Sequence, residues 1–199
     1  MDFSNSQTAG VLMRAYAGEC QAQMRYTLAA ALARRQQLPL IGKVFQFTAK
    51  QERTHAERFM QRMQQNGLFV QEITGTYPVD PQDDLAAILD AAVQHETDEA
   101  DTVYPAFAQT AQDEGFLQEA ELLRRIAEIE RSHAARFAMF RQMLREGTLF
   151  REQTQTEWLC LHCGHLHTGT EPPQTCPVCG AVQGYAVRRA LAPYTSDSE

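Results

Sequence analysis

The chain has 199 residues and a mass of 22.4 kDa, which is enough for one domain or for one domain with a small added module. Its 44% hydrophobic and 22% charged residues exclude global disorder and a fibrous repeat. A net charge of −7 argues against a nucleic-acid partner. No apolar run approaches the ~20 residues of a membrane span, and the first residues lack the pattern of a signal peptide. We therefore expect a cytoplasmic protein with no nucleic-acid or membrane partner.

Four long helices are predicted between residue 8 and about residue 147. They cover residues 8–36, 39–66, 80–114 and 116–145. Ser6 or Thr8 can cap the first helix, and Asp80 followed by Pro81 is typical of the start of the third. Pro105 lies inside the third helix, where we expect a kink or a local widening. Two short connections and one irregular link over residues 68–80 predict an all-α four-helix bundle with one long crossover.

The C-terminal part of the chain has a different composition. From Trp158 onward Gly, Pro, Thr and Cys dominate, and helical periodicity is lost. A segment of this length is too short to fold on a hydrophobic core alone, so we expect a metal to stabilise it, with Trp158 and Tyr185 as its small core. The expected division is a bundle over residues 1–149, a linker over 150–157 and a metal-binding module of strands and loops over 158–199.

Each predicted helix has an inward apolar stripe that acidic or imidazole side chains interrupt near its middle. The interrupting residues are Glu19, Glu52, His55, Glu96, Glu99, Glu130 and His133. Burying such groups without a shared partner costs several kcal/mol each. Two helices carry Glu-x-x-His, which places both side chains on one face, and each of the other two supplies a glutamate. This is the dinuclear carboxylate pattern of ferritin-like bundles, and the mixed ligands suit iron or manganese.

Glu99 makes the pattern asymmetric. The equivalent position of the first helix is Ala22, so the site has seven candidate ligands rather than six. A seventh carboxylate suits a centre that changes its coordination with oxidation state; alternatively, Glu99 only hydrogen-bonds to a ligand. Glu128 and His95 lie off the stripes and are not expected to be ligands.

Four cysteines form a second candidate metal site. Cys160-x-x-Cys163 and Cys176-x-x-Cys179 can arrange four thiolates as a tetrahedron around zinc or a single iron. Spacing alone favours zinc, whereas a redox-active centre in the same chain favours iron. The fifth cysteine, Cys20, lies off the stripe of Glu19 and is expected to be a buried structural thiol.

Together these motifs resemble the rubrerythrin family over nearly the whole chain. The resemblance rests on Gly18-Glu19-Cys20-Gln21-Ala22, on Tyr104-Pro105-x-Phe107-Ala108, on the two Glu-x-x-His motifs and on Trp158-x-Cys160-x-x-Cys163-Gly164 with Cys176-Pro177-x-Cys179. It implies a ferritin-like bundle with a C-terminal rubredoxin-like domain. It also implies a non-haem di-iron centre held by all seven candidate ligands and a rubredoxin-type iron on the four cysteines.

The resemblance further assigns roles to single residues. It implies that one iron exchanges His55 for Glu99 between oxidation states, and that Tyr26 and Tyr104 hydrogen-bond to ligand carboxylates. The sequence departs from the family in having Cys20 where serine is more usual, and one extra residue between Glu96 and Glu130.

The expected function is a peroxidase that reduces hydrogen peroxide to water, with electrons relayed through the four-cysteine iron. Rubredoxin or an NAD(P)H-dependent reductase would supply the electrons, because no Gly-rich dinucleotide motif is present. A helix of ~25 residues is nearly 40 Å long at about 1.5 Å per residue, so a head-to-tail homodimer is expected to bring the two kinds of iron together. The alternatives are a ferroxidase that uses dioxygen and a zinc-stabilised binding module.

Overall fold

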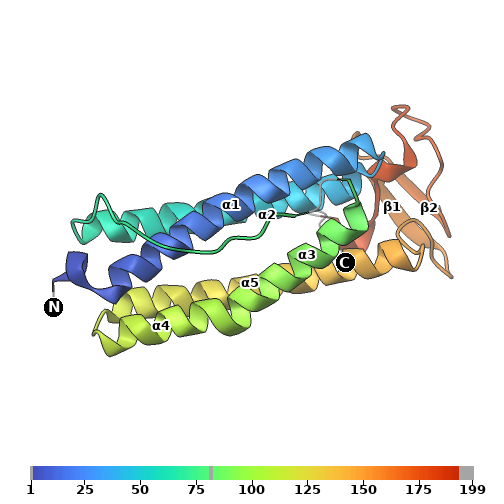
Figure 1. Cartoon of the computed structure of the whole chain (residues 1–199). Helices are drawn as coiled ribbons and strands as arrows, with labels where there is room; N and C mark the ends of the chain where they lie inside the picture. The colour runs from blue at the N-terminus through green and yellow to red at the C-terminus, as the bar shows by residue number, and fades with distance from the viewer. Residues whose placement is uncertain (1, 81–82, 193–199) are drawn as a thin grey trace.

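The computed structural model describes residues 2–80 and 83–192. Its long helices are α1 (Gln7–Arg35), α2 (Pro39–Gln65), α3 (Leu85–Asp98), α4 (Tyr104–Asp113) and α5 (Leu117–Arg145). A π-helical turn over Glu99–Val103 joins α3 to α4, so that α3 and α4 act as one long interrupted helix. Helix α1 packs against α2, and α3 and α4 pack against α5. The long link between α2 and α3 runs along the bundle beside α1 (Figure 1), which confirms a four-helix bundle with one crossover.

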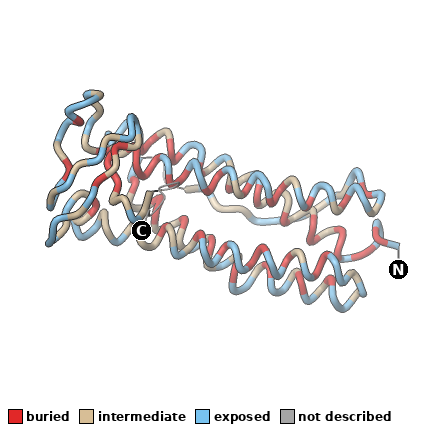
Figure 2. The backbone as a smooth tube through the Cα atoms, turned by 180° about the vertical axis from the view of Figure 1, so that it is seen from behind, coloured by how far each residue is buried: buried red, intermediate tan, exposed pale blue. Residues whose placement is uncertain are grey.

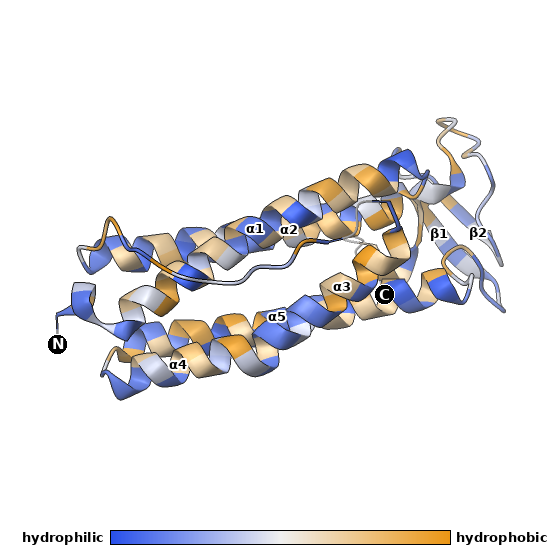
Figure 3. Ribbon diagram, viewed as in Figure 1, coloured by the Kyte–Doolittle hydropathy of each residue, from blue (hydrophilic) through white to orange (hydrophobic). Residues whose placement is uncertain are grey.

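The interior of the bundle consists of two apolar clusters. Tyr26, Phe45 and Phe137 form the centre of one cluster, with ring centroids 5.0–5.7 Å apart. Phe59 and Leu123 belong to the other cluster, at the end of the bundle where α1 begins. Buried residues follow the inner faces of the helices (Figure 2), and hydrophilic residues cover much of their outer faces (Figure 3). Apolar burial of this kind stabilises the bundle on both sides of its polar centre.

The start of the third helix differs from the prediction. Helix α3 begins at Leu85, and its N-cap is Asp84, whose carboxylate accepts hydrogen bonds from the N–H groups of Ala86 and Ala87. Asp80 is not the cap, because its carboxylate lies 3.5 Å from Arg25 Nε in a tertiary ion pair. The predicted first residue, Pro81, lies outside the described residues.

The widening predicted at Pro105 is confirmed. The π-helical turn ends at Val103, two residues before Pro105, and the N–H of Tyr104 donates to the carbonyl of Glu99. Proline at this position removes a donor and disfavours a regular α-helix in the preceding turn. At the other end of the chain, Ser6 is the N-cap of α1, with its hydroxyl 3.1 Å from the N–H of Ala9.

The cysteine module is a small antiparallel sheet in the order β2-β1-β3. Its strands are β1 (Thr156–Cys160), β2 (Leu166–Gly169) and β3 (Ala186–Arg188). Trp158 is 1% exposed and donates to the carbonyl of Gly169 at 2.9 Å, as expected of the module's core, whereas Tyr185 is half-buried with its ring against His162.

The module packs on the end of the bundle where α1 turns into α2 (Figure 1). Val187 shares a buried cluster with residues of the bundle, and the backbone of Gly184 lies against the carbonyl of Gln37. Bundle and module are therefore packed directly against each other. No helix in the described ranges is long and apolar enough to cross a membrane.

Candidate metal centres

Six of the seven predicted bundle ligands meet at the centre of the bundle. They form two groups in which all donor atoms lie within 4.8 Å of one another; the groups are Glu19, Glu52, His55 and Glu130, and Glu52, Glu96, Glu130 and His133. Glu52 and Glu130 belong to both groups. All six side chains are buried, and each Glu-x-x-His pair places its two members one helical turn apart on the inner face of α2 or α5.

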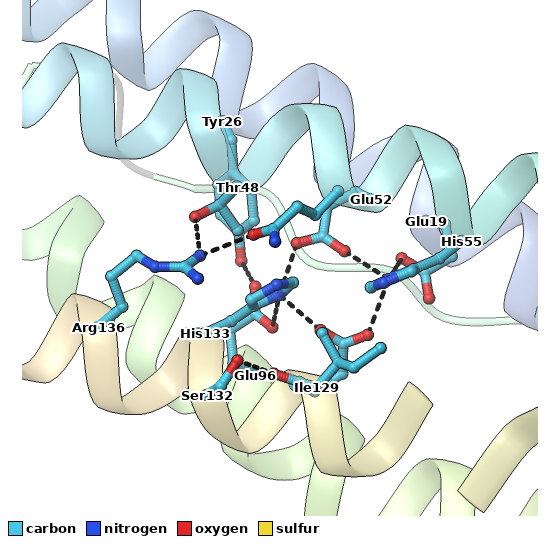
Figure 4. Close-up of polar contacts among 12 residues, drawn as sticks. Glu19, Tyr26, Thr48, Glu52, His55, Glu96, Ile129, Ser132, His133 and Arg136 are labelled. Carbon is cyan, nitrogen blue, oxygen red and sulfur yellow. Dashed lines mark hydrogen bonds and ion pairs between the residues drawn. The ribbon is translucent and has the colours of Figure 1, made fainter. Parts of the chain in front are cut away.

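The shared glutamates have the geometry of bridging ligands. His55 Nδ1 lies 3.1 Å from Glu52 Oε2 and 3.1 Å from Glu130 Oε1. His133 Nδ1 lies 3.0 Å from Glu52 Oε1 and 2.7 Å from Glu130 Oε2. Each of these carboxylates thus directs one oxygen to each side of the cluster, and Figure 4 shows Glu52 between the two imidazoles.

Each remaining glutamate completes one side. Glu19 Oε2 lies 3.6 Å from His55 Nδ1, and Glu96 Oε2 lies 3.3 Å from His133 Nδ1. One side therefore has Glu19 and His55, the other has Glu96 and His133, and the two sides share two carboxylates. The two imidazole rings are stacked with centroids 5.7 Å apart.

Several potential metal-ligand atoms of this cluster have no hydrogen-bond partner in the described part of the chain. Among the described residues, nothing hydrogen-bonds to the buried atoms Glu19 Oε2, Glu52 Oε1, Glu96 Oε2, Glu130 Oε1 and Oε2, and His133 Nδ1 and Nε2. So many buried, uncompensated acceptors would be strongly destabilising in a core held only by protein contacts. Cations held between the carboxylates and one nitrogen of each imidazole would compensate the carboxylate oxygens and one ring nitrogen of His133, and this set of ligands fits two irons.

The electrostatics of the cluster also favour positive charge. Burial and the neighbouring Glu130 raise the pKa of Glu19 well above its usual range, and burial and Glu52 do the same for Glu96. Burial opposes a charged imidazole, but the carboxylates of Glu130, Glu52 and Glu96, which lie 2.7–3.3 Å from Nδ1, outweigh it and raise the pKa of His133 to about 11. Carboxylates that hold a proton on imidazole so strongly also attract divalent cations.

Two buried tyrosines orient the terminal carboxylates. The Tyr26 hydroxyl donates to Glu96 Oε1, and the Tyr104 hydroxyl donates to Glu19 Oε1. Each phenol thus reaches the glutamate of the other helix pair. Burial raises the pKa of both phenols well above 10, which keeps them protonated as donors. The structure therefore brings both predicted tyrosines into contact with the cluster.

Glu99 is the one predicted ligand that the structure keeps outside both groups. It is half-buried, starts the π-helical turn, and lines a pocket of about 450 Å³ beside the cluster. Burial and the nearby Glu130 raise its pKa to about 8. Neither of the two residues that were not expected to be ligands belongs to the ligand groups: Glu128 is exposed, and His95 lines the same pocket as Glu99, with its Nδ1 3.6 Å from Asp80 Oδ1.

Arg136 is a neighbour of the cluster to which the sequence analysis gave no role. Its guanidinium donates at 2.9 Å to the Thr48 hydroxyl and at 2.9 Å to the Gln51 carbonyl oxygen (Figure 4). Burial lowers its pKa, whereas the charges of Glu96 and Glu52 act to raise it. The sequence does indicate that Arg136 lies near the cluster, because a residue three positions after His133 lies on the same face of the helix.

The four predicted cysteines of the module come together as one site. Their sulfur atoms all lie within 4.8 Å of one another, with 3.8 Å between Cys160 and Cys179 and 3.7 Å between Cys163 and Cys176. A tetrahedron with metal–sulfur bonds of about 2.3 Å has edges of about 3.8 Å. The quartet therefore has the dimensions of a four-thiolate site for iron or zinc.

The prediction for the fifth cysteine was wrong. Cys20 is exposed and is not a buried structural thiol. One step along an α-helix rotates a side chain by about 100°, which carries Cys20 from the buried direction of Glu19 to the outer face of α1.

Comparison with known proteins agrees with both sites. The family model described as Rubrerythrin matches residues 10–141, and the one described as the rubredoxin-like domain of rubrerythrin matches residues 158–185. The rubrerythrin of Porphyromonas gingivalis is 37% identical over 90% of this chain and 88% of its own length. That of Nitratidesulfovibrio vulgaris is 35% identical over 87% and 90%.

Solved structures share the fold. A mixed-valence nigerythrin structure has a TM-score of 0.61 and 24% identity, and the match covers 94% of this chain and 93% of that one. A bacterioferritin from Desulfovibrio desulfuricans has a TM-score of 0.64 and 20% identity over 71% and 82% of the two chains. These matches confirm the predicted ferritin-like bundle with a rubredoxin-like module.

Proposed function

The chain belongs to the rubrerythrin family, and from this premise we propose that it is a peroxidase that reduces hydrogen peroxide to water. The family combines a di-iron site with a rubredoxin-like four-cysteine site, and this chain has the residues for both. In the proposal Glu52 and Glu130, which belong to both groups, would be shared by the two irons, and Glu19 with His55 and Glu96 with His133 would hold one iron each. Bound iron supplies the electrons and the Lewis acidity that cleavage of an O–O bond requires.

The observation that carries the proposal is the position of Glu99. This extra carboxylate stands outside the ligand groups, in the pocket that adjoins them. There it is available to replace His55 as a ligand when the oxidation state changes, the role that the family resemblance implies. A bundle that only oxidises and stores iron has no evident use for it. Tyr104, which lines the same pocket, holds Glu19 in place and is suited to donate a proton beside it.

The four-cysteine site serves as the electron relay in this proposal. The module contacts its own bundle near Gln37, 18 residues after Glu19, a separation of about 27 Å along an α-helix. This is long for rapid transfer within one chain. We therefore propose a head-to-tail homodimer in the cytoplasm, in which the bundle (residues 1–149) of one chain receives electrons from the module (158–199) of the other. Residues 150–157 link the bundle and the module within each chain. Rubredoxin or an NAD(P)H-dependent reductase would reduce the module.

Anaerobic rapid mixing tests the proposal. The fully reduced protein is mixed with stoichiometric hydrogen peroxide or with dioxygen, and the visible thiolate-to-iron absorption is followed. We expect the absorption to return rapidly with peroxide and much more slowly with dioxygen. Faster return with dioxygen would favour the ferroxidase. A purified protein without this absorption in any state, and with zinc on its cysteines, would favour the binding module.

A further inference from the structure

The pocket beside Glu99 is much larger than hydrogen peroxide requires. Its volume is about 450 Å³, whereas a water molecule occupies roughly 30 Å³ of liquid and hydrogen peroxide is only one oxygen atom larger. Pockets for small organic ligands occupy about 300–1,000 Å³. The pocket can therefore accommodate a substrate that carries a carbon skeleton.

The apolar walls of the pocket come from four segments, and Arg14, His95 and Asp98 add charged or polar groups to its lining. Tyr77 and Pro78 belong to the link between α2 and α3, Val103 ends the π-helical turn, and Phe107 lies on α4. Gly18 of α1 also lines the pocket, beside Tyr77, and a Cβ atom there would stand 3.8 Å from the Tyr77 ring. Apolar walls around a small number of polar groups are typical of a site that binds an organic molecule.

Side-chain contacts hold these walls together. The Tyr77 hydroxyl donates to the carbonyl of Arg14 at 3.2 Å, which fixes the link against α1. The guanidinium of Arg14 lies 5.3 Å from the centroid of the Phe107 ring, a distance at which cation and ring attract each other. The link, α1 and α4 thus meet around the pocket, and Figure 1 shows the link passing between the helix pairs.

The pocket also reaches the ligand cluster. Glu99 and Tyr104 both line the pocket, and the Tyr104 hydroxyl donates a hydrogen bond to Glu19 of the cluster. A molecule in the pocket can therefore direct a polar end towards these groups while its apolar part contacts the walls.

We propose that this pocket binds small organic hydroperoxides, with the carbon skeleton against Tyr77, Val103 and Phe107 and the O–O group towards Glu99 and Tyr104. This proposal rests on the peroxidase function above and specifies its substrate class. The reaction is ROOH + 2 e⁻ + 2 H⁺ → ROH + H₂O. The O–O bond breaks, both of its oxygens are reduced, the reduced irons supply the two electrons, and solvent supplies the protons.

A binding measurement tests the pocket without turnover. The probe is 2-phenylpropan-2-ol, the alcohol with the skeleton of cumene hydroperoxide, titrated into the oxidised holoprotein and followed by ligand-observed NMR. We expect saturable binding that weakens on the order of tenfold in Gly18→Leu, which fills the pocket, and in Phe107→Ala, which removes an aromatic wall. Gly10→Leu is the matched control, because it lies on the same helix and an added Cβ there meets nothing within 4 Å.

A kinetic measurement tests the substrate class. Reduced protein is mixed with cumene hydroperoxide or hydrogen peroxide, and the ratio of the two rate constants is compared among the same variants. We expect this ratio to fall in Gly18→Leu and Phe107→Ala and to stay at the wild-type value in Gly10→Leu. Absence of alcohol binding, or a ratio that neither pocket variant changes, would overturn the proposal; if one variant does not fold, the other decides. If the reduced wild-type protein reacts with neither cumene hydroperoxide nor hydrogen peroxide, the peroxidase function itself is refuted.

Discussion

Replacing Gly184 with alanine should weaken the attachment of the cysteine module to the bundle. A Cβ atom at this position would lie 2.1 Å from the carbonyl oxygen of Gln37 and 2.7 Å from Pro39 Cδ. An ordinary contact needs more than 1 Å of additional separation. The neighbouring backbone cannot yield easily, because Gln37 already has a φ of 58° and Pro39 starts a helix. Overpacking of this kind costs about 1–3 kcal/mol, which corresponds to a fall in Tm of about 2–12 °C for a chain of this size.

Scanning calorimetry of the metal-loaded protein measures this effect. Gly10→Ala is the control, since Gly10 lies inside α1 with nothing within 4 Å of an added Cβ. Alanine should stabilise that helix by about 1 kcal/mol and raise Tm by about 2–4 °C. The two substitutions are chemically identical and should change Tm in opposite directions. An unchanged Tm in Gly184→Ala, or equal falls in both variants, would refute the packing argument.

Three further substitutions test other parts of the structure. Glu114→Gln should lower stability at pH 7 by about 1 kcal/mol, because the Glu114 carboxylate accepts hydrogen bonds from N–H groups at the start of α1 and from the Thr8 hydroxyl. Burial acts to raise the pKa of Glu114, but these hydrogen bonds outweigh it and lower the pKa below its usual 4.5. The stabilisation is therefore present above pH 4.5 and is lost as the pH falls through the lowered pKa. The urea midpoints of variant and wild type should accordingly converge in acid. Tyr104→Phe removes the hydrogen bond to Glu19 and should slow peroxide reduction by about tenfold; an unchanged rate in rapid mixing would exclude a positioning role. Cys163→Ser leaves three thiolates and should weaken and shift the thiolate-to-iron absorption without lowering the iron content of the bundle; loss of both irons from the bundle would contradict two independent sites.

The parts predicted correctly from sequence were those in which local chemistry and helical periodicity agree. Carboxylate and imidazole at inward positions of four helices indicated a common centre, and the structure brings six of these side chains together. The start of α3 was missed because Asp80 and Asp84 are equally good N-caps. The choice between them depends on the ion pair of Asp80 with Arg25, a contact between distant segments. The exposure of Cys20 likewise depends on which helices cover which side of α1.

The position of Glu99 beside the cluster accompanies a difference of one residue between the two helix pairs. Glu19 precedes Tyr26 by seven residues, whereas Glu96 precedes Tyr104 by eight, yet each tyrosine reaches the glutamate of the other pair. One added residue in a regular α-helix would rotate Tyr104 about 100° away from the site. The π-helical turn absorbs this residue, so Tyr104 keeps its contact while Glu99, at the start of the turn, lines the pocket. Periodicity reveals the extra residue and Pro105 indicates a kink or widening nearby, but neither indicates that Glu99 would stand outside the cluster and line the pocket. The inserted residue thus leaves the symmetric ligands and Tyr104 in place, and the additional carboxylate on one side of the centre comes from Glu99, which stands where the first helix pair has Ala22.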